Sequence, residues 1–572
     1  MPFEPRASRG PGTLERVPMH RRDLTMPSLQ PPDIPAPGKA GADAHQLSAL
    51  TPLRAPVFRM LWTVWLTANV CMWMSDVAAA WVMTSMTTSP LWVALVQTAS
   101  TLPVFLLGLP SGALADILDR RRYFISTQIW VAAIGLMLSA AIASGAMTPL
   151  LLVALTFANG MGLAMRWPVF AALIPDLVPR SQLSAALALN GVAMNISRVA
   201  GPVVAGALIA GAGSAWVFLL NVILSVACAF AVTRWRYRPA PNPLGRERFV
   251  RAMRVGIQFV AQSASLKATL LRIFIFFFHS TALLALLPLV ALGLGSGDAR
   301  TFTYLLASMG AGAITAALYL PRMVRLLRPE AMVAGGTTLM GASTAVVALA
   351  PNMYVAVAGM LAAGAAWTST ANSLSVSAQL ALPDWVRARG MAIYQMALMG
   401  GGSLGAAVWG QVAASSSVAA ALVLSAAAGV IAMYLAYALV AARSREEDLT
   451  PSRELTAPAI DVPPGAGPVV VTIEYLIDPA HAQAFLDLMQ ESRRSRLRQG
   501  ALSWELLADV AVPGRYVERI VDESWVEHLR RFDRITAADV ALRERKLAFH
   551  TGDAPPLIAR YIVQGMAAHR RA

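Results

Sequence analysis

A few ionisable residues lie inside long apolar stretches of this sequence, where a charge needs a partner or a role. Asp76 is the only acidic residue deep in such a stretch, and Arg198 and His279 lie within two others. A charged side chain at the centre of a bilayer costs about 2.5–3.5 kcal/mol on insertion scales. Because the protonation of a buried carboxyl responds to neighbouring charges, an arginine that moves relative to Asp76 could load and unload a proton. The alternatives are a static ion pair, or an aspartate that faces water without titrating.

Helix geometry places two of these residues at similar depths. With a rise of about 1.5 Å per residue, Asp76 comes about 24 Å and Arg198 about 21 Å from the arginine-rich ends of their segments. His279 comes near mid-depth in a third segment, and Arg166 lies nearer the arginine-rich end of a fourth. We therefore predict that Asp76, Arg198 and His279 take part in proton coupling, and that Asp76 and Arg198 can pair.

The apolar stretches that hold these residues are long enough to cross a membrane. Hydrophobic residues make up 56% of the chain and charged residues 14%, with a mean hydropathy of +0.55, whereas a soluble chain carries about 25% charged residues. A span needs roughly 20 mostly apolar residues, and because its backbone must be satisfied within the segment it is a helix. The sequence predicts an all-α membrane region of twelve transmembrane helices, near residues 58–84, 91–115, 123–145, 149–172, 184–210, 214–233, 268–293, 301–320, 330–350, 353–376, 389–413 and 417–441.

The loops between these segments alternate in charge. The loops at 85–90, 146–148, 211–213, 294–300, 351–352 and 414–416 hold a single basic residue, Arg300. The other loops are rich in arginine, at Arg120, Arg121, Arg122, Arg180, Arg234, Arg236, Arg238, Arg246, Arg248, Arg251, Arg254, Arg322, Arg325, Arg328, Arg387 and Arg389. Since positive loops stay cytoplasmic, we predict a multi-pass protein of a bacterial-type inner membrane with both termini in the cytoplasm. The net charge of +15 then faces anionic headgroups, and no basic patch with aromatic residues indicates nucleic-acid binding.

Short internal matches indicate that the membrane region is duplicated. Residues 112–116 recur as 312–316, each followed by an arginine-rich loop, and residues 175–178 recur as 383–386. Two six-helix repeats that rock around a midplane site are the usual architecture of secondary transporters. We divide the chain into a disordered cytoplasmic N-terminus at 1–50, a first six-helix half at 51–233, a central cytoplasmic linker at 234–264, a second half at 265–443, a second linker at 444–467 and a tail domain at 468–565.

The tail has the composition of a small soluble domain. Alternating and helical patterns predict strands near 469–477, 504–510, 516–524 and 557–563, and helices near 479–497 and 525–535. This β-α-β-β-α-β order predicts a small α+β domain of the ferredoxin-like type on the cytoplasmic side. Its candidates for chemistry are Trp504, Trp525, His528 and His550, which show no metal-ligand or triad spacing. We therefore predict a non-catalytic dimerisation or regulatory domain.

Several motifs point to one family. The loop between the second and third predicted spans has the spacing Gly-x-x-x-Asp-x-x-x-Arg-Arg, at Gly112, Asp116, Arg120 and Arg121. It resembles the signature loop of the major facilitator superfamily, which normally has glycine where Asp119 stands. Residues 77–83, 174–180, 188–190, 198–202 and 382–387 resemble the branch that includes the enterobactin exporter and transmembrane secretion effector proteins. This resemblance covers roughly residues 50–440, and the tail resembles the small dimeric domains related to antibiotic-biosynthesis monooxygenases.

The resemblance implies a secondary active transporter that works by alternating access, with proton-coupled export of small amphiphilic molecules such as drugs, siderophores or secondary metabolites. In the cytoplasmic gating loop, Asp116 would accept charge-assisted hydrogen bonds from Arg120 or Arg121 in one state only. The alternative is that these arginines only fix topology. In the fifth predicted span, Gly201, Pro202 and Gly206 resemble a helix-bend motif of antiporters, and the alternative is ordinary tight packing.

Two other functions stay open, an uptake permease on the same fold and a membrane-anchored enzyme or sensor that acts through the tail. Asp76 and the glycine-proline motif favour export, and the tail's lack of catalytic spacing argues against an enzyme. No nucleotide-binding loop is found, so direct use of ATP is not expected. We expect no metal and no cofactor. The expected partners are the lipid bilayer, a small-molecule substrate, protons, and a second copy of the chain through the tail.

Overall fold

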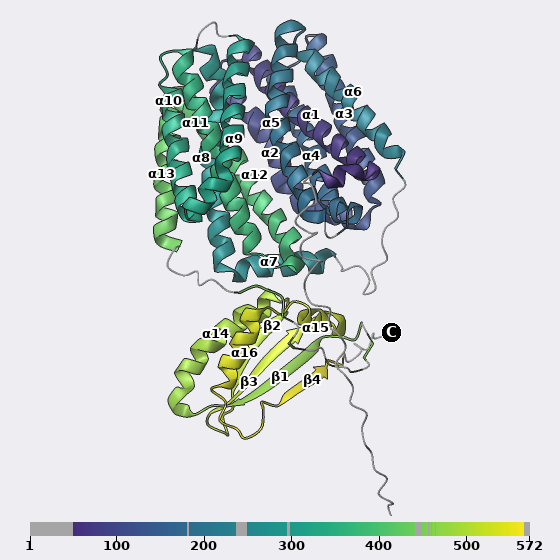
Figure 1. Cartoon of the computed structure of the whole chain (residues 1–572), viewed down its shortest axis with the longest axis vertical. Coiled ribbons are helices and arrows are strands. Elements are labelled where there is room, and N and C mark those ends of the chain that lie inside the picture. Colours follow the sequence, from purple (N-terminus) through teal and green to yellow (C-terminus); the bar gives the residue numbers. More distant parts are fainter. Residues whose placement is uncertain are drawn as a thin grey trace, which may run out of the picture. The chain divides into compact units, whose positions relative to one another are not determined.

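The computed structural model describes residues 50–564, apart from 180–181, 236–248, 295–297, 441–447 and isolated positions between 453 and 464. The predicted disordered segment at 1–50 therefore lies almost entirely outside the described residues, as does much of each predicted linker. Within the described ranges, the chain forms a helical region up to residue 440 and a small α/β tail from residue 469 (Figure 1).

Long helices make up the membrane region. The first half consists of α1 (Pro56–Met86), α2 (Pro90–Ile117), α3 (Arg120–Ala143), α4 (Pro149–Leu177), α5 (Leu183–Gly211) and α6 (Ser214–Thr233). The second consists of α8 (Ala264–Leu292), α9 (Ala299–Leu326), α10 (Pro329–Ala348), α11 (Met353–Leu380), α12 (Asp384–Ser415) and α13 (Val418–Val440), and α7 (Phe249–Gln262) lies between them. Among the described residues, eleven of these helices are long and apolar enough to cross a membrane; α1 is not one of the eleven.

The helix ends follow from local sequence. Proline occupies the first turn of α1, α2, α4 and α10, where its missing N–H costs no hydrogen bond. Ser263, Asp298 and Asn352 cap α8, α9 and α11 by accepting hydrogen bonds from backbone N–H groups in the first turn. These caps satisfy donors that the helix itself leaves unpaired. These prolines and capping residues therefore fix where each helix begins.

The helices of the two halves pack in equivalent pairs. In the first half α2 packs on α4, α1 on α5, and α3 on α6; in the second, α9 packs on α11, α8 on α12, and α10 on α13. Between the halves, α2 packs on α12 and α5 on α9. Figure 1 shows this arrangement, with the purple and blue helices of the first half beside the teal and green helices of the second. The packing is what the duplicated sequence leads one to expect, and the α2–α12 and α5–α9 contacts form a seam between the halves.

Glycine permits the closest helix contacts in both halves. A Cβ placed on Gly364 of α11 would overlap the backbone of α9 at Met309, and one on Gly160 of α4 would come within 2.7 Å of the carbonyl oxygen of Ser100 in α2. Helices in membranes pack by such close approach, because apolar burial gives little driving force there. The α2–α4 and α9–α11 pairs are thus backbone-to-backbone contacts, and each half is a tightly packed unit.

The tail contains a four-stranded antiparallel sheet in the order β2-β3-β1-β4. Its elements are β1 (Val469–Leu476), α14 (Ala482–Arg498), β2 (Ser503–Ala508), β3 (Arg515–Asp522), α15 (Trp525–Phe532), α16 (Ala537–Leu547) and β4 (Ile558–Ile562). The predicted strands and helices are present within a few residues of their expected bounds. The sequence analysis missed α16, a short, strongly charged helix that begins with a capping box at Thr536 and Asp539.

Candidate functional site

Asp76 lies at the contact of α1 with α2. The Ser100 hydroxyl, on α2, donates a hydrogen bond of 2.7 Å to Oδ1 of Asp76, and the Asp76 side chain is half-buried. Gly160 sets this geometry, since it lets the α4 backbone approach the carbonyl of Ser100 and so fixes α2 at this level. The carboxyl is thus held by a neutral hydroxyl donor within the helical region.

Arg198 does not pair with Asp76 in the state that the structure describes, so their pairing stays a prediction. Among the described residues, its guanidinium lies over the ring of Trp73, 5.8 Å from the centroid, and its Nε has no hydrogen-bond partner. Trp73 and Asp76 are three residues apart on α1, so they share one face of that helix. Arg198 therefore lies beside α1 about one turn from Asp76, and a turn is about 5.4 Å.

The glycine-proline motif of α5 explains why Arg198 lies so close to α1. Gly201, one turn after Arg198, packs where a Cβ would overlap the Cβ of Trp73 and come within 3.1 Å of the Val70 carbonyl oxygen. Gly206, further along α5, packs against Thr303 of α9 in the other half. Pro202 lies inside the helix between the two contacts. The motif thus links the surroundings of Asp76 to the seam between the halves.

Arg166 occupies a separate buried site. Its Nη2 donates to the carbonyl oxygen of Ala68 at 3.2 Å, and its guanidinium lies over the ring of Trp65 at 5.5 Å. Ala68 is eight residues before Asp76, which is about 12 Å along a helix. The Trp65 ring also stacks on Phe170 at 4.1 Å. Arg166 therefore fastens α4 to α1 away from the carboxyl.

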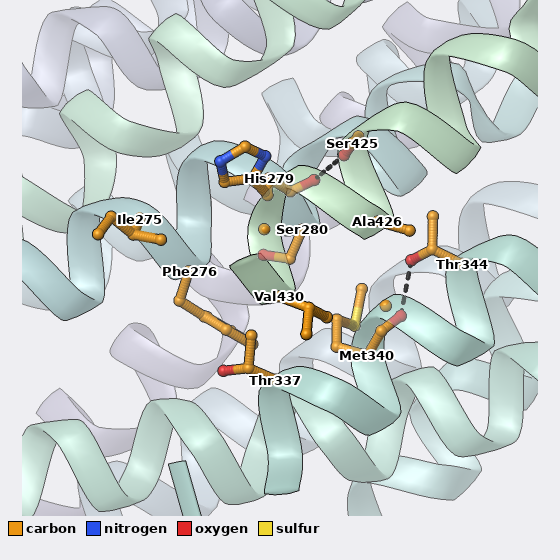
Figure 2. A pocket seen from close by; sticks show the side chains of 12 residues that line it. Ile275, Phe276, His279, Ser280, Thr337, Met340, Thr344, Ser425, Ala426 and Val430 are labelled. Carbon is orange, nitrogen blue, oxygen red and sulfur yellow. Dashed lines mark hydrogen bonds between the residues drawn. The ribbon is translucent and has the colours of Figure 1, made fainter. Parts of the chain in front are cut away.

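His279 lies in the second half and is not brought together with Asp76 or Arg198. Its ring centroid is 5.5 Å from that of Trp409, and its backbone carbonyl accepts a 2.8 Å hydrogen bond from Ser425. His279 and Ser280 line a cavity of about 20 Å³ between α8, α10 and α13 (Figure 2). That volume holds about one water molecule. The His279 ring thus packs against Phe278 and Trp409, its Nδ1 has no hydrogen-bond partner among the described residues, and its role in proton coupling stays a prediction.

The predicted gating loop is described only in part. The surroundings of Gly112 and the side chain of Asp116 lie outside what the structure describes, so the latch stays a prediction. Arg121 has partners that the sequence analysis did not anticipate: its Nε donates at 3.2 Å to the carbonyl oxygen of Val232, and its Nη2 donates to that of Thr233. A cation at these carbonyls caps the end of α6. Asp119, where the family loop has glycine, caps α3 by accepting from the backbone N–H groups of Arg121 and Arg122.

The tail buries a charged network that sequence spacing did not reveal. Glu518 is fully buried, and its carboxylate accepts hydrogen bonds from Trp504 at 2.9 Å, Ser492 at 2.8 Å and Lys546 at 3.2 Å. Burial alone would raise the pKa of this carboxyl, but Lys546, Arg496, Trp504 and Ser492 together hold it well below its usual range. Burial also lowers the pKa of the Lys546 ammonium to about 8, with Glu518 opposing the shift. The predicted candidate Trp504 therefore serves this network.

The other predicted candidates of the tail have structural partners. His528 is buried against Trp525, with ring centroids 5.3 Å apart, and its Nδ1 is 2.8 Å from an oxygen of Asp522. Its Nε2 accepts from Arg560 at 3.3 Å, so the imidazole has no open nitrogen to act as a base. Nδ1 of His550 accepts from the backbone N–H of Leu476 at 3.0 Å.

The sequence model of the transmembrane secretion effector family matches residues 47–568. The chain belongs to this family. It is a membrane transporter of the major facilitator type, and the fold and the homologues are those of transporters rather than enzymes. The match includes the tail, so this transmembrane secretion effector carries its tail within the region that the family shares.

Solved structures confirm the fold of this transmembrane secretion effector. A bacterial homologue of the human lysosomal transporter Spinster, in an inward-facing and unoccupied conformation, is similar with a TM-score of 0.53 and 15% identity, over 68% of this chain and 96% of that one. A mutant of the nucleoside transporter NupG is similar with a TM-score of 0.55 and 12% identity, over 67% of this chain and 99% of that one.

Curated relatives match shorter parts of the chain. A probable actinorhodin transporter of Streptomyces coelicolor is 34% identical over 131 residues, which is 22% of each protein. Macrolide efflux protein A of Streptococcus pyogenes is 23% identical over 299 residues, 51% of this chain and 73% of its own. The staphyloferrin A transporter of Staphylococcus aureus is 20% identical over 258 residues, 45% of this chain and 64% of its own. The chain thus spans between about a fifth and three quarters of these relatives.

Proposed function

We propose that this transporter exports small amphiphilic molecules by alternating access and couples export to proton entry through Asp76. The observation that carries the proposal is the position of the two ionisable side chains. Asp76 accepts a hydrogen bond from Ser100, and Arg198 lies about one helical turn away over Trp73. A relative named for macrolide efflux supports the outward direction, and relatives named as actinorhodin and staphyloferrin A transporters support small organic molecules as substrates.

The proposed cycle uses two positions of α5 relative to α1. In the present position Arg198 lies over Trp73, and Asp76 is free to hold a proton beside Ser100. In the other position Arg198 reaches the carboxylate, which favours the ionised form and releases the proton. Because Gly206 connects α5 to α9 across the seam, the same movement is tied to the rocking of the two halves. Proton release and substrate release would then occur on opposite sides of the membrane.

The finer features of the architecture belong to the same proposal. We propose that α1 also crosses the membrane, which brings the number of transmembrane helices to twelve. The arginine-rich loops and both termini are cytoplasmic, and the membrane is the bacterial inner membrane. The tail is of the ferredoxin-like, monooxygenase-related type, is non-catalytic, and pairs with a second copy of itself. The strand order β2-β3-β1-β4 supports the first of these statements about the tail. The polar residues of α1, which include Asp76, are then accommodated inside the bundle rather than in lipid.

The experiment compares Asp76→Asn with Asp76→Glu in a host that lacks the native protein. Substrates are first found as compounds that accumulate in cells without the transporter, from a panel that includes a macrolide. Efflux of such a compound from proteoliposomes is then measured under an imposed pH gradient. Asp76→Asn should abolish the gradient-driven component, whereas Asp76→Glu, which keeps a carboxyl, should retain a measurable part.

Two results would count against the proposal. If Asp76→Asn shows the wild-type dependence of efflux on the pH gradient, Asp76 is not the coupling group. If the compound accumulates faster in cells that contain the protein, the direction is uptake and export is wrong. Equal amounts of membrane-inserted protein in all variants serve as the control for folding.

A further inference from the structure

The tail contains a cavity of about 520 Å³ between the sheet and its helices. Small-molecule sites in proteins usually measure about 300–1,000 Å³ and are mostly apolar. The apolar part of this wall comes from β1, β4, α15, α16 and the turn between these two helices, with the side chains Val471, Ile473, Phe532, Ile535, Leu547 and Ile558. In size and lining the cavity therefore fits an organic molecule with an apolar ring or chain.

The other part of the wall is strongly basic. Five basic side chains border the cavity, Arg496, Arg531, Arg543, Lys546 and Arg560. Four acids are in reach: Glu518 pairs with Lys546 and Arg496, Asp522 pairs with Arg531, Asp539 at the start of α16 attracts Arg496, and Glu454 lies on the exposed rim. Five cations against four anions leave an excess of one positive charge around a largely apolar space. Such an excess favours an anionic occupant, because the low dielectric of the cavity strengthens the attraction.

Arg543 and Arg560 are the two arginines that offer this positive charge to a ligand. Neither forms an ion pair among the residues that the structure describes, whereas Arg496, Arg531 and Lys546 all do. Arg560 is nonetheless positioned: its Nε donates to Nε2 of His528 at 3.3 Å. His528 is in turn fixed through Nδ1, which donates to Asp522 at 2.8 Å. This chain leaves the other guanidinium donors of Arg560 for a ligand, in the planar geometry that suits a carboxylate.

A buried acceptor adds a second requirement. Gln499 lines the cavity and is almost fully buried, and its Oε1 has no hydrogen-bond donor among the described residues. Its Nε2 donates to Ser495 at 3.3 Å, which fixes the amide. Buried polar groups in native proteins are nearly always hydrogen-bonded. A ligand that carries a hydroxyl or N–H group as well as an anion would satisfy Gln499 and the two arginines together.

We propose that this cavity binds an amphiphilic organic anion, a carboxylate on an apolar ring system that also carries a hydrogen-bond donor. The cavity is separate from Asp76 and from the seam, so the site makes the tail a ligand-binding domain whether or not export is proton-coupled. In this proposal α16 forms part of the binding site, since this helix contributes both Arg543 and Lys546 to the cavity wall.

The test measures binding by the full-length transporter in lipid nanodiscs, by equilibrium dialysis with 6-hydroxy-2-naphthoate. The neutral analogue 6-hydroxy-2-naphthamide is the matched ligand control. We expect saturable binding of one naphthoate per chain, and weaker binding of the amide by about tenfold, the loss of roughly one charge-assisted hydrogen bond. Arg543→Ala and Arg560→Ala should each weaken binding of the naphthoate by about tenfold or more for the same reason.

Two further variants test whether binding depends on this cavity. They distinguish it from a general effect of positive charge and from binding within the membrane region. Arg545→Ala removes a positive charge on the same helix from an exposed pair with Glu491, and it should leave binding unchanged. Ile558→Trp adds bulk to the apolar wall without a change in charge, and it should abolish binding. The proposal is overturned if wild-type protein shows no saturable binding, if Arg545→Ala weakens binding as much as Arg543→Ala, or if Ile558→Trp binds normally. Transport measurements do not enter this test, so failure of the exporter proposal leaves its outcome readable.

Discussion

Replacement of Glu518 by glutamine should destabilise the tail far more than the loss of one surface charge. The glutamine has nearly the same shape but removes the negative charge that lies 3.2 Å from Lys546 Nζ and 3.5 Å from Arg496 Nε. Glu518 is fully buried, and the side chain of Lys546 is only 3% exposed, so water cannot replace the lost partner. Removal of one member of a buried ion pair costs about 3–5 kcal/mol. We expect a loss of that size for the tail.

The assay is hydrogen exchange with mass spectrometry on the full-length protein, which reports the opening free energy of β1 and β3 separately from that of the membrane helices. Glu505→Gln is the matched control, because its ion pair with Arg519 is exposed on both sides and such pairs contribute about 0–1 kcal/mol. The double variant Glu518→Gln with Lys546→Met should recover part of the loss, because it removes the unpaired ammonium as well. If Glu518→Gln costs no more than Glu505→Gln, the buried network does not stabilise the tail.

The same network predicts how the tail responds to acid. The folded-state pKa of Glu518 lies below its usual value, so the unfolded chain binds a proton there that the folded tail does not. Its contribution to stability is therefore present above the unfolded pKa of about 4.3 and is lost as the pH falls towards the folded value. Between pH 5 and pH 3 the wild-type tail should lose more protection from exchange than Glu518→Gln. Parallel losses in the two proteins would contradict this account.

Three further predictions concern the membrane helices. Gly364→Ala should push α11 away from the α9 backbone and lower the yield of folded protein, at a cost of about 1–3 kcal/mol typical of overpacking. Gly335→Ala is the control and should leave the yield unchanged, because no atom lies within 4 Å of the new Cβ. Gly206→Ala should open the seam at Thr303 and raise the labelling of engineered cysteines there by a membrane-impermeant maleimide, with Gly211→Ala on the same helix unchanged; equal labelling would show that the contact does not gate access. Arg121→Ala should release the end of α6 and speed hydrogen exchange at residues 229–233, and unchanged exchange would mean that the cap contributes nothing.

Hydropathy and loop charge predict most of the helical region, because a membrane span must be apolar and internally hydrogen-bonded wherever it occurs. The duplicated motifs likewise anticipate the equivalent helix pairs. Partners across helices are a different matter. Equal depth suggested that Asp76 meets Arg198, but depth ignores rotation about the helix axis, and the structure places Ser100 at the carboxyl and Trp73 under the guanidinium.

The tail shows the same limit in another form. Period-two and helical patterns predict its strands and two of its helices, but α16 is short and highly charged and was missed. The structure explains one of its charges, because Lys546 donates a hydrogen bond to Glu518, 28 residues away in sequence. The lone motif that sequence analysis could have used is the capping box at Thr536 and Asp539, which marks the start of α16.

The seam between α2 and α12 has a consequence for how the chain is made. Thr98 of α2 donates to the carbonyl oxygen of Ser403 in α12 at 3.1 Å, across 305 residues of sequence. At about 5–20 residues per second, α12 leaves the ribosome roughly 15–60 s after α2 does. During that interval α12 is not yet available to pack on this face of α2. The Thr98 hydroxyl still has an acceptor in its own helix, the carbonyl oxygen of Ala94 at 3.4 Å. This hydroxyl can therefore stay hydrogen-bonded while the first half waits in the bilayer, and the seam closes only after α12 has been made.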